Sequence, residues 1–75
     1  MNICDTLIHI RDTLSPEARS ALENEMREIG GVIAPRFNPG QQHLLLVAYD
    51  SDAVGASALL DKVRGRGLDA SLVAI

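Results

Sequence analysis

Few side chains in this 75-residue chain could bind a metal ion: one cysteine, Cys4, and two histidines, His9 and His43. One thiol can form neither a thiolate cage nor an intramolecular disulfide by itself. Cys4 and His9 lie five residues apart in one extended segment, which separates them by about 16 Å. Antiparallel pairing of residues 6–11 with residues 43–49 would place His43 at the far end from Cys4. We therefore expect no metal site within one chain, and we interpret Cys4 as a small strand residue.

Groups suited to catalysis or anion binding are equally sparse. No Ser-His-Asp arrangement with supporting turn residues is apparent. Glu23, Glu25 and Glu28 fall outside the apolar stripe of a predicted helix and indicate a solvated face. Arg64 and Arg66 could hold an anion near a helix N-terminus, although a solvated basic turn after a helix is the simpler interpretation. We expect a protein that is not an enzyme and uses no cofactor.

Composition excludes two further classes of function. Asp and Glu number 10 against 7 Lys and Arg, for a formal net charge of -3, whereas nucleic-acid binders usually carry a basic surplus. The longest apolar run, residues 44–49, is far shorter than the roughly 20 residues that span a bilayer. The first residues lack the features of a signal peptide, and a lone cysteine suits a reducing compartment. We expect a cytoplasmic protein that binds neither nucleic acid nor membranes.

The hydrophobic pattern predicts four strands. They are expected at residues 6–11, 32–37, 43–49 and 68–75. Pro35 cannot donate to a strand ladder, so the second strand should lie at a sheet edge. With a helix after the first and third strands, the economical fold is one ferredoxin-like domain over residues 1–75. Its antiparallel sheet should have the strand order 4-1-3-2, with both helices on one face.

Capping residues predict where the helices begin and end. Ser15 and Pro16 should start the first helix, and Gly30 with Gly31 should end it. Its apolar stripe comprises Ala18, Ala21, Leu22, Met26 and Ile29. Either Ser51 or Asp52 should cap the second helix. That helix should bury Ala56, Leu59, Leu60 and Val63, and should end at Gly65 and Gly67.

Core and turn residues along nearly the whole chain follow a known pattern. They are Leu22, Met26, Ile29 and Gly31-Val32, then Val47-Ala48-Tyr49-Asp50, Leu59-Leu60 and Val63, and Gly67-Leu68-Asp69-Ala70. This pattern resembles the heavy-metal-associated domain, the family of small copper chaperones and of the N-terminal domains of metal-pumping ATPases. In that family the loop after the first strand carries Met-x-Cys-x-x-Cys, whose thiolates hold a soft cation such as Cu(I). The corresponding residues 12–18 contain neither Cys nor Met, so the resemblance implies the scaffold but no metal ligand.

The third predicted strand is apolar on both faces. The register of the family implies that Leu45, Val47 and Tyr49 face the helices and that the opposite set faces outward. A solvated sheet face normally carries polar residues at alternate positions, and a contiguous exposed apolar patch indicates an interface. Leu72 or Val73 could extend the patch. The expected interface residues are Leu7, His9, Leu44, Leu46 and Ala48.

These observations leave three hypotheses. The first is a small protein-interaction module that forms a homodimer, or binds another protein, through this face; His9 would be a surface residue or a pH-sensitive contact there. The second is an atypical metal carrier that uses Cys4 and a His, across a dimer. The third is small-molecule regulation as in ACT domains, which share this topology but have a Gly-Leu after the first strand that is absent at Pro16-Glu17.

Overall fold

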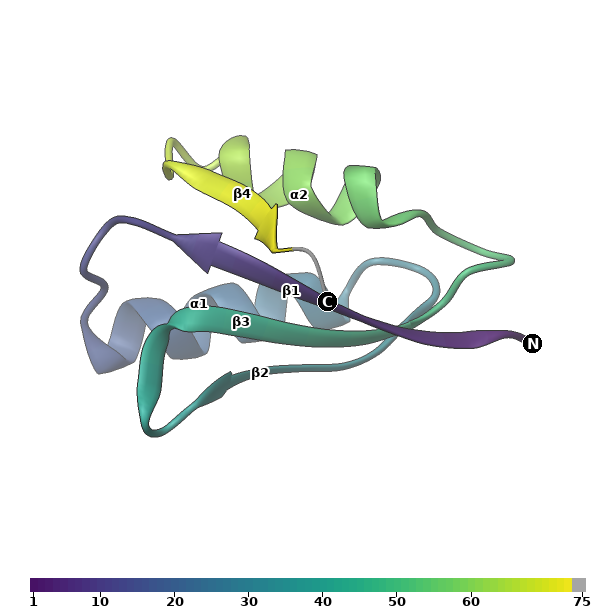
Figure 1. Cartoon of the computed structure of the whole chain (residues 1–75), viewed down its shortest axis with the longest axis horizontal. Coiled ribbons are helices and arrows are strands. Elements are labelled where there is room, and N and C mark those ends of the chain that lie inside the picture. The colour runs from purple at the N-terminus through teal and green to yellow at the C-terminus, as the bar shows by residue number, and fades with distance from the viewer. Residues whose placement is uncertain (74–75) are drawn as a thin grey trace.

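The computed structural model describes residues 1–73 as one antiparallel sheet with two helices (Figure 1). The elements are β1 (Ile3–Ile10), α1 (Pro16–Arg27), β2 (Val32–Asn38), β3 (Gln41–Asp50), α2 (Ala56–Arg64) and β4 (Ala70–Val73). The strand order β2-β3-β1-β4 confirms the predicted ferredoxin-like fold and places β2 at an edge. The last predicted strand includes residues 74 and 75, which lie outside the described residues.

Helix α1 begins where the sequence predicts. The Ser15 hydroxyl accepts a hydrogen bond from the Ala18 amide at 3.1 Å, and Pro16 is the first helical residue. Leu22 and Met26 are fully buried, whereas Ala21 is exposed and does not belong to the buried stripe. The helix therefore rests on the sheet along a narrower line of side chains than the stripe predicts.

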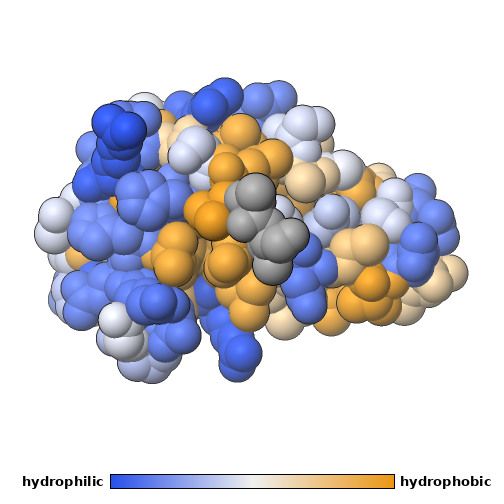
Figure 2. Space-filling model, in the orientation of Figure 1, coloured by the Kyte–Doolittle hydropathy of each residue, from blue (hydrophilic) through white to orange (hydrophobic). Residues whose placement is uncertain are grey.

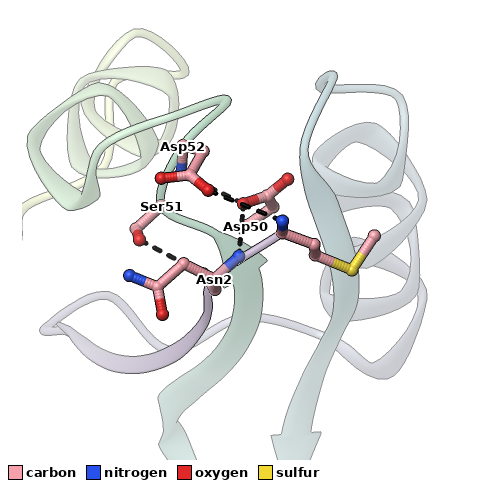
Figure 3. Close-up of polar contacts among 5 residues, drawn as sticks. Asn2, Asp50, Ser51 and Asp52 are labelled. Atoms are coloured by element: carbon pink, nitrogen blue, oxygen red, sulfur yellow. Dashed lines mark hydrogen bonds and ion pairs between the residues drawn. The ribbon is translucent and has the colours of Figure 1, made fainter.

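The predicted start of α2 is wrong. The helix begins at Ala56 after Gly55, and no side chain caps it. Ser51 instead donates from its amide and its hydroxyl to the carbonyl oxygen of Asn2, at 2.8 and 3.1 Å (Figure 3). The Asp50 carboxylate accepts from the amides of Asn2 and Asp52, both at 3.0 Å. The side chains of Asp50 and Ser51 therefore connect the end of β3 to the start of β1. They lie too far before Ala56 to cap α2.

The core fills the space between the helices and one face of the sheet. Strand β3 contributes Leu45, Val47 and Tyr49, which are buried as expected. Strand β1 adds Ile8 and Ile10, both with 0% exposure. The α2 residues Leu59, Leu60 and Val63 close the core, as predicted.

Candidate interaction surface on the open sheet face

The face of the sheet turned away from the helices carries the five predicted interface residues. Leu7 pairs with Leu46 across strands β1 and β3, and His9 pairs with Leu44. Directly paired residues point to the same face, and the neighbouring β3 residues face the core. All five predicted residues, Ala48 included, are half-buried. We call this surface, Leu7, His9, Leu44, Leu46 and Ala48, the open face.

Two flanking strands extend the apolar part of the open face. Val73 of β4 pairs with Leu7, whereas Leu72 pairs with the buried Ile8. Val73 is therefore the β4 residue that continues the patch, and Leu72 is not. On the other side, Ala34 of β2 pairs with Ala48. In Figure 1 α1 lies behind β1 and β3, and in the same view Figure 2 shows hydrophobic surface gathered over the middle of the molecule.

One acidic and one basic residue flank the centre of the open face. Asp5 of β1 pairs with Ala48, and Arg36 of β2 pairs with Leu46. Arg36 also lines a hollow of about 210 Å³ together with the apolar residues Leu7 and Leu44. The two charges therefore lie on opposite sides of β3, with apolar side chains between them.

The outer edge of β2 is closed to another strand. The Phe37 amide donates to a Glu23 carboxylate oxygen at 2.8 Å, so it points away from β3. Pro35 lies two residues before Phe37, and the backbone N–H at that position of a strand would also point outward. Because proline has no N–H, this position has no donor. A strand that added here would find neither donor available.

The structure separates Cys4 from the histidine of its own strand. Cys4 pairs with Tyr49 and packs against the core, on the side of the helices. His9 lies on the open face. The two side chains therefore lie on opposite sides of the sheet.

His43, however, lies nearer to His9 than expected. The ring centroids of His9 and His43 are 6.2 Å apart. Sequence reasoning missed this pair because it compared the position of His43 with that of Cys4 and not with that of His9. His43 directly precedes Leu44, the partner of His9, so strand alternation alone would turn the two side chains to opposite faces. The rings approach one another because His43 lies where β1 ends and its ring turns back to the Ile10 carbonyl oxygen.

The loop between β1 and α1, residues 11–15, contains neither Cys nor Met. The Asp12 carboxylate accepts a hydrogen bond from the Asp69 amide at 2.7 Å. Arg19 donates to the Leu14 carbonyl oxygen, also at 2.7 Å. Carboxylate and hydroxyl oxygens suit hard cations, whereas Cu(I) selects thiolates and thioethers. The residues between β1 and α1 therefore do not fit a thiolate-bound ion.

Arg64 and Arg66 make contacts within the chain. The Arg64 guanidinium donates to the Ala70 carbonyl oxygen at 3.0 Å. Arg66 pairs with the Glu25 carboxylate. The anion site remains a prediction, and these contacts would compete with any anion bound there.

No family model and no curated protein matches the sequence, but solved structures match the fold. A copper binding domain from HMA7, a P-type ATPase, has a TM-score of 0.82 and 14% identity over 93% of both chains. Oxidized MerP from Ralstonia metallidurans CH34 has a TM-score of 0.83 and 10% identity over 96% of this chain and 99% of its own. The CopZ metallochaperone has a TM-score of 0.80 and 22% identity over 91% of this chain and 100% of its own.

These likenesses confirm that the chain has the ferredoxin-like fold of heavy-metal-associated domains, as the residue pattern predicts. None of the helices within residues 1–73 is long and apolar enough to cross a membrane.

Proposed function

We propose that this protein is a cytoplasmic, non-enzymatic interaction module of a single domain that forms a homodimer through the open face. The observation that carries the proposal is the position of Leu44, Leu46 and Ala48 on the uncovered side of β3. Because these apolar side chains occupy consecutive outward positions, burying them against another protein surface would be energetically favourable. The lone cysteine suits a reducing compartment.

The arrangement of charges supports a second copy as the occupant. A homodimer interface with two-fold symmetry brings residue i of one copy to residue j of the other, and the reverse. An axis that crosses β3 between Leu46 and Ala48 would set Asp5 of each copy opposite Arg36 of the second copy. The open face is thus complementary to itself in charge as well as in hydrophobicity.

The closed edge of β2 argues against association by strand addition at that edge of the sheet. Glu23 and Pro35 remove the two outward donors that a new strand would use at this edge. Four strands about 4.8 Å apart present a face of only roughly 400 Å². Because interfaces of that size are at the weak end, we expect a dimer that forms reversibly as the concentration of the protein rises.

The position of Cys4 is our reason for preferring this proposal to the alternative of a metal carrier that uses Cys4 and a His across a dimer. Cys4 packs on the side of the helices. A dimer formed through the open face would cover His9 but would leave Cys4 on the far side of each sheet.

Leu46→Glu tests the proposed dimer. The substitution places a charge at the centre of the interface, so the dimer dissociation constant should rise at least about tenfold, equivalent to about 1.4 kcal/mol. Ala21→Glu is the matched control, since it adds the same charge at an exposed position on α1, away from the open face. Sedimentation equilibrium over a range of concentrations measures both. A parent that stays monomeric throughout, or equal weakening by both variants, contradicts the proposal.

A charge exchange tests whether the partner is a second copy. Asp5→Arg alone and Arg36→Asp alone each put like charges opposite one another and should weaken the dimer. The double variant restores both pairs and should recover most of the affinity. Additive weakening in the double variant would contradict the proposed two-fold arrangement.

A further inference from the structure

His9 and His43 belong to the end of the sheet where β1 ends and β3 begins, and their rings lie close together. Figure 1 shows that the β2–β3 hairpin turns at this same end. The ring centroids of His9 and His43 are 6.2 Å apart, and the ring planes are inclined by 32°. Leu44, the residue after His43, is the direct cross-strand partner of His9. Strand pairing therefore holds the two backbone positions in register, and only side-chain rotation adjusts the rings.

The backbone fixes the tautomer of His43. Its Nδ1 lies 2.7 Å from the carbonyl oxygen of Ile10. A carbonyl oxygen can only accept, so Nδ1 must carry the proton, and in the neutral ring Nε2 then carries a lone pair. Histidines that bind metal ions typically donate their other ring N–H to a carbonyl or carboxylate, which orients the ring and increases its basicity. His43 already has this arrangement.

The separation of the rings fits two ligands of one ion. A histidine nitrogen lies about 2.0–2.1 Å from a bound metal such as Zn²⁺, so two rings on one ion have centroids roughly 4.5–5.5 Å apart at ligand angles of 90–120° and about 6.4 Å apart when they lie opposite one another. The observed 6.2 Å corresponds to two nearly opposite ligands, an arrangement found in the square-planar geometry of Cu²⁺ and Ni²⁺. Imidazole nitrogen suits Cu, Ni and Zn rather than Mg or Ca.

The surroundings leave room for further ligands. His9 and His43 line an open hollow of about 470 Å³, together with Leu44 and hairpin residues 39–42. The lining includes Gln41 and Gln42, whose side-chain amides each contain an oxygen that can act as a ligand. Within the described residues 1–73, no group of three or more His, Cys, Asp or Glu could hold a metal ion. Water or a glutamine amide would therefore complete the coordination.

We infer that His9 and His43 of one chain bind a borderline transition-metal cation, with Cu²⁺ held more tightly than Ni²⁺ or Zn²⁺ as the general order of stability requires. The site lies on the hairpin side of the sheet and uses no residue of the loop between β1 and α1. It replaces the expectation that no metal is bound, and it needs only one chain, although His9 also belongs to the open face.

Titration calorimetry tests the site in a Cys4→Ser background, which removes the only thiol. Cu²⁺, Ni²⁺ and Zn²⁺ should each bind at one ion per chain, and Mg²⁺ should not. His9→Asn and His43→Asn should each raise the dissociation constant at least about tenfold. Changes to residues that only hydrogen-bond to a metal ligand already weaken metal binding by that factor. Circular dichroism confirms that both variants fold. Unchanged affinity in either variant overturns the inference.

A second measurement locates the ion. In NMR spectra of the same protein, substoichiometric Ni²⁺ should broaden the ring protons of both histidines together. Broadening of one ring alone overturns the two-histidine site. Leu46→Glu should leave ion binding intact while it weakens the dimer, and loss of binding in that variant would assign the ion to an interface between copies instead. Failure of the dimer proposal therefore leaves this result interpretable.

Discussion

Two glutamates that the sequence marks as solvated have structural partners. A Glu23 carboxylate oxygen accepts from the Phe37 amide at 2.8 Å. Glu25 pairs with Arg66 and lies 3.9 Å from the Lys62 ammonium group. The prediction was wrong for these two residues because α1 packs beside the edge of β2 and beside α2. The polar flank of the helix thus faces a strand edge and a neighbouring helix as well as water.

Glu23→Ala should destabilise the fold. The substitution leaves the partly buried Phe37 amide without its charged acceptor, a loss of about 1–3 kcal/mol in the free energy of unfolding. Glu28→Ala is the control, since Glu28 is an exposed acidic residue of the same segment. Urea unfolding measures both variants. Equal stability of the two would show that the Glu23 hydrogen bond contributes nothing.

The connection from α1 to β2 depends on one glycine. Gly31 has a φ of +96°, a conformation that residues with a side chain rarely adopt. A Cβ atom built there would lie 2.8 Å from the Cβ of Ala53 and 3.0 Å from a methyl carbon of Val54. The turn after α1 is therefore pressed against the turn before α2. The sequence predicted a glycine stop here but not the second contact.

Adjacent glycines provide a matched test of this connection. Gly31→Ala should lower the free energy of unfolding by about 1–3 kcal/mol from backbone strain, with the overlap against Ala53 adding to it. Gly30→Ala should be neutral or slightly stabilising, because a Cβ at Gly30 meets no atom within 4 Å. Thermal unfolding of the two variants should separate them clearly. A similar melting temperature for both would refute the close approach at Gly31.

Across the whole molecule, β3 has two different roles. Its helix-facing side chains, such as Leu45, are fully buried in the core of the monomer. Its opposite side chains, such as Leu44, are half-buried and belong to the open face. Stability of the monomer and association between copies therefore depend on alternate residues of one strand.

Alanine at these two neighbouring positions should separate the roles. Leu45→Ala leaves a cavity and should cost about 2–5 kcal/mol, a large share of the roughly 4–11 kcal/mol expected for a domain of this size. Leu44→Ala should cost about 1 kcal/mol in the monomer and should weaken the dimer. Chemical denaturation at low protein concentration measures the first effect, and sedimentation the second. The reverse order of stability would mean that β3 faces the other way.

The sequence by itself determined the features that depend on neighbouring residues. Ser15 and Pro16 start α1 because a cap bonds to an amide three residues away. Pro35 places β2 at an edge because proline lacks a donor wherever the strand lies. The alternation of β3 separates a covered face from an open one because successive side chains point to opposite sides.

Only the tertiary structure decided which distant residues meet. Ser51 bonds to Asn2 rather than to a helix, and Glu23 reaches Phe37, because strands and helices far apart in the chain lie side by side. The proximity of the His9 and His43 rings depends in the same way on the register between β1 and β3. Such contacts follow from the packing of whole elements, which no short stretch of sequence specifies.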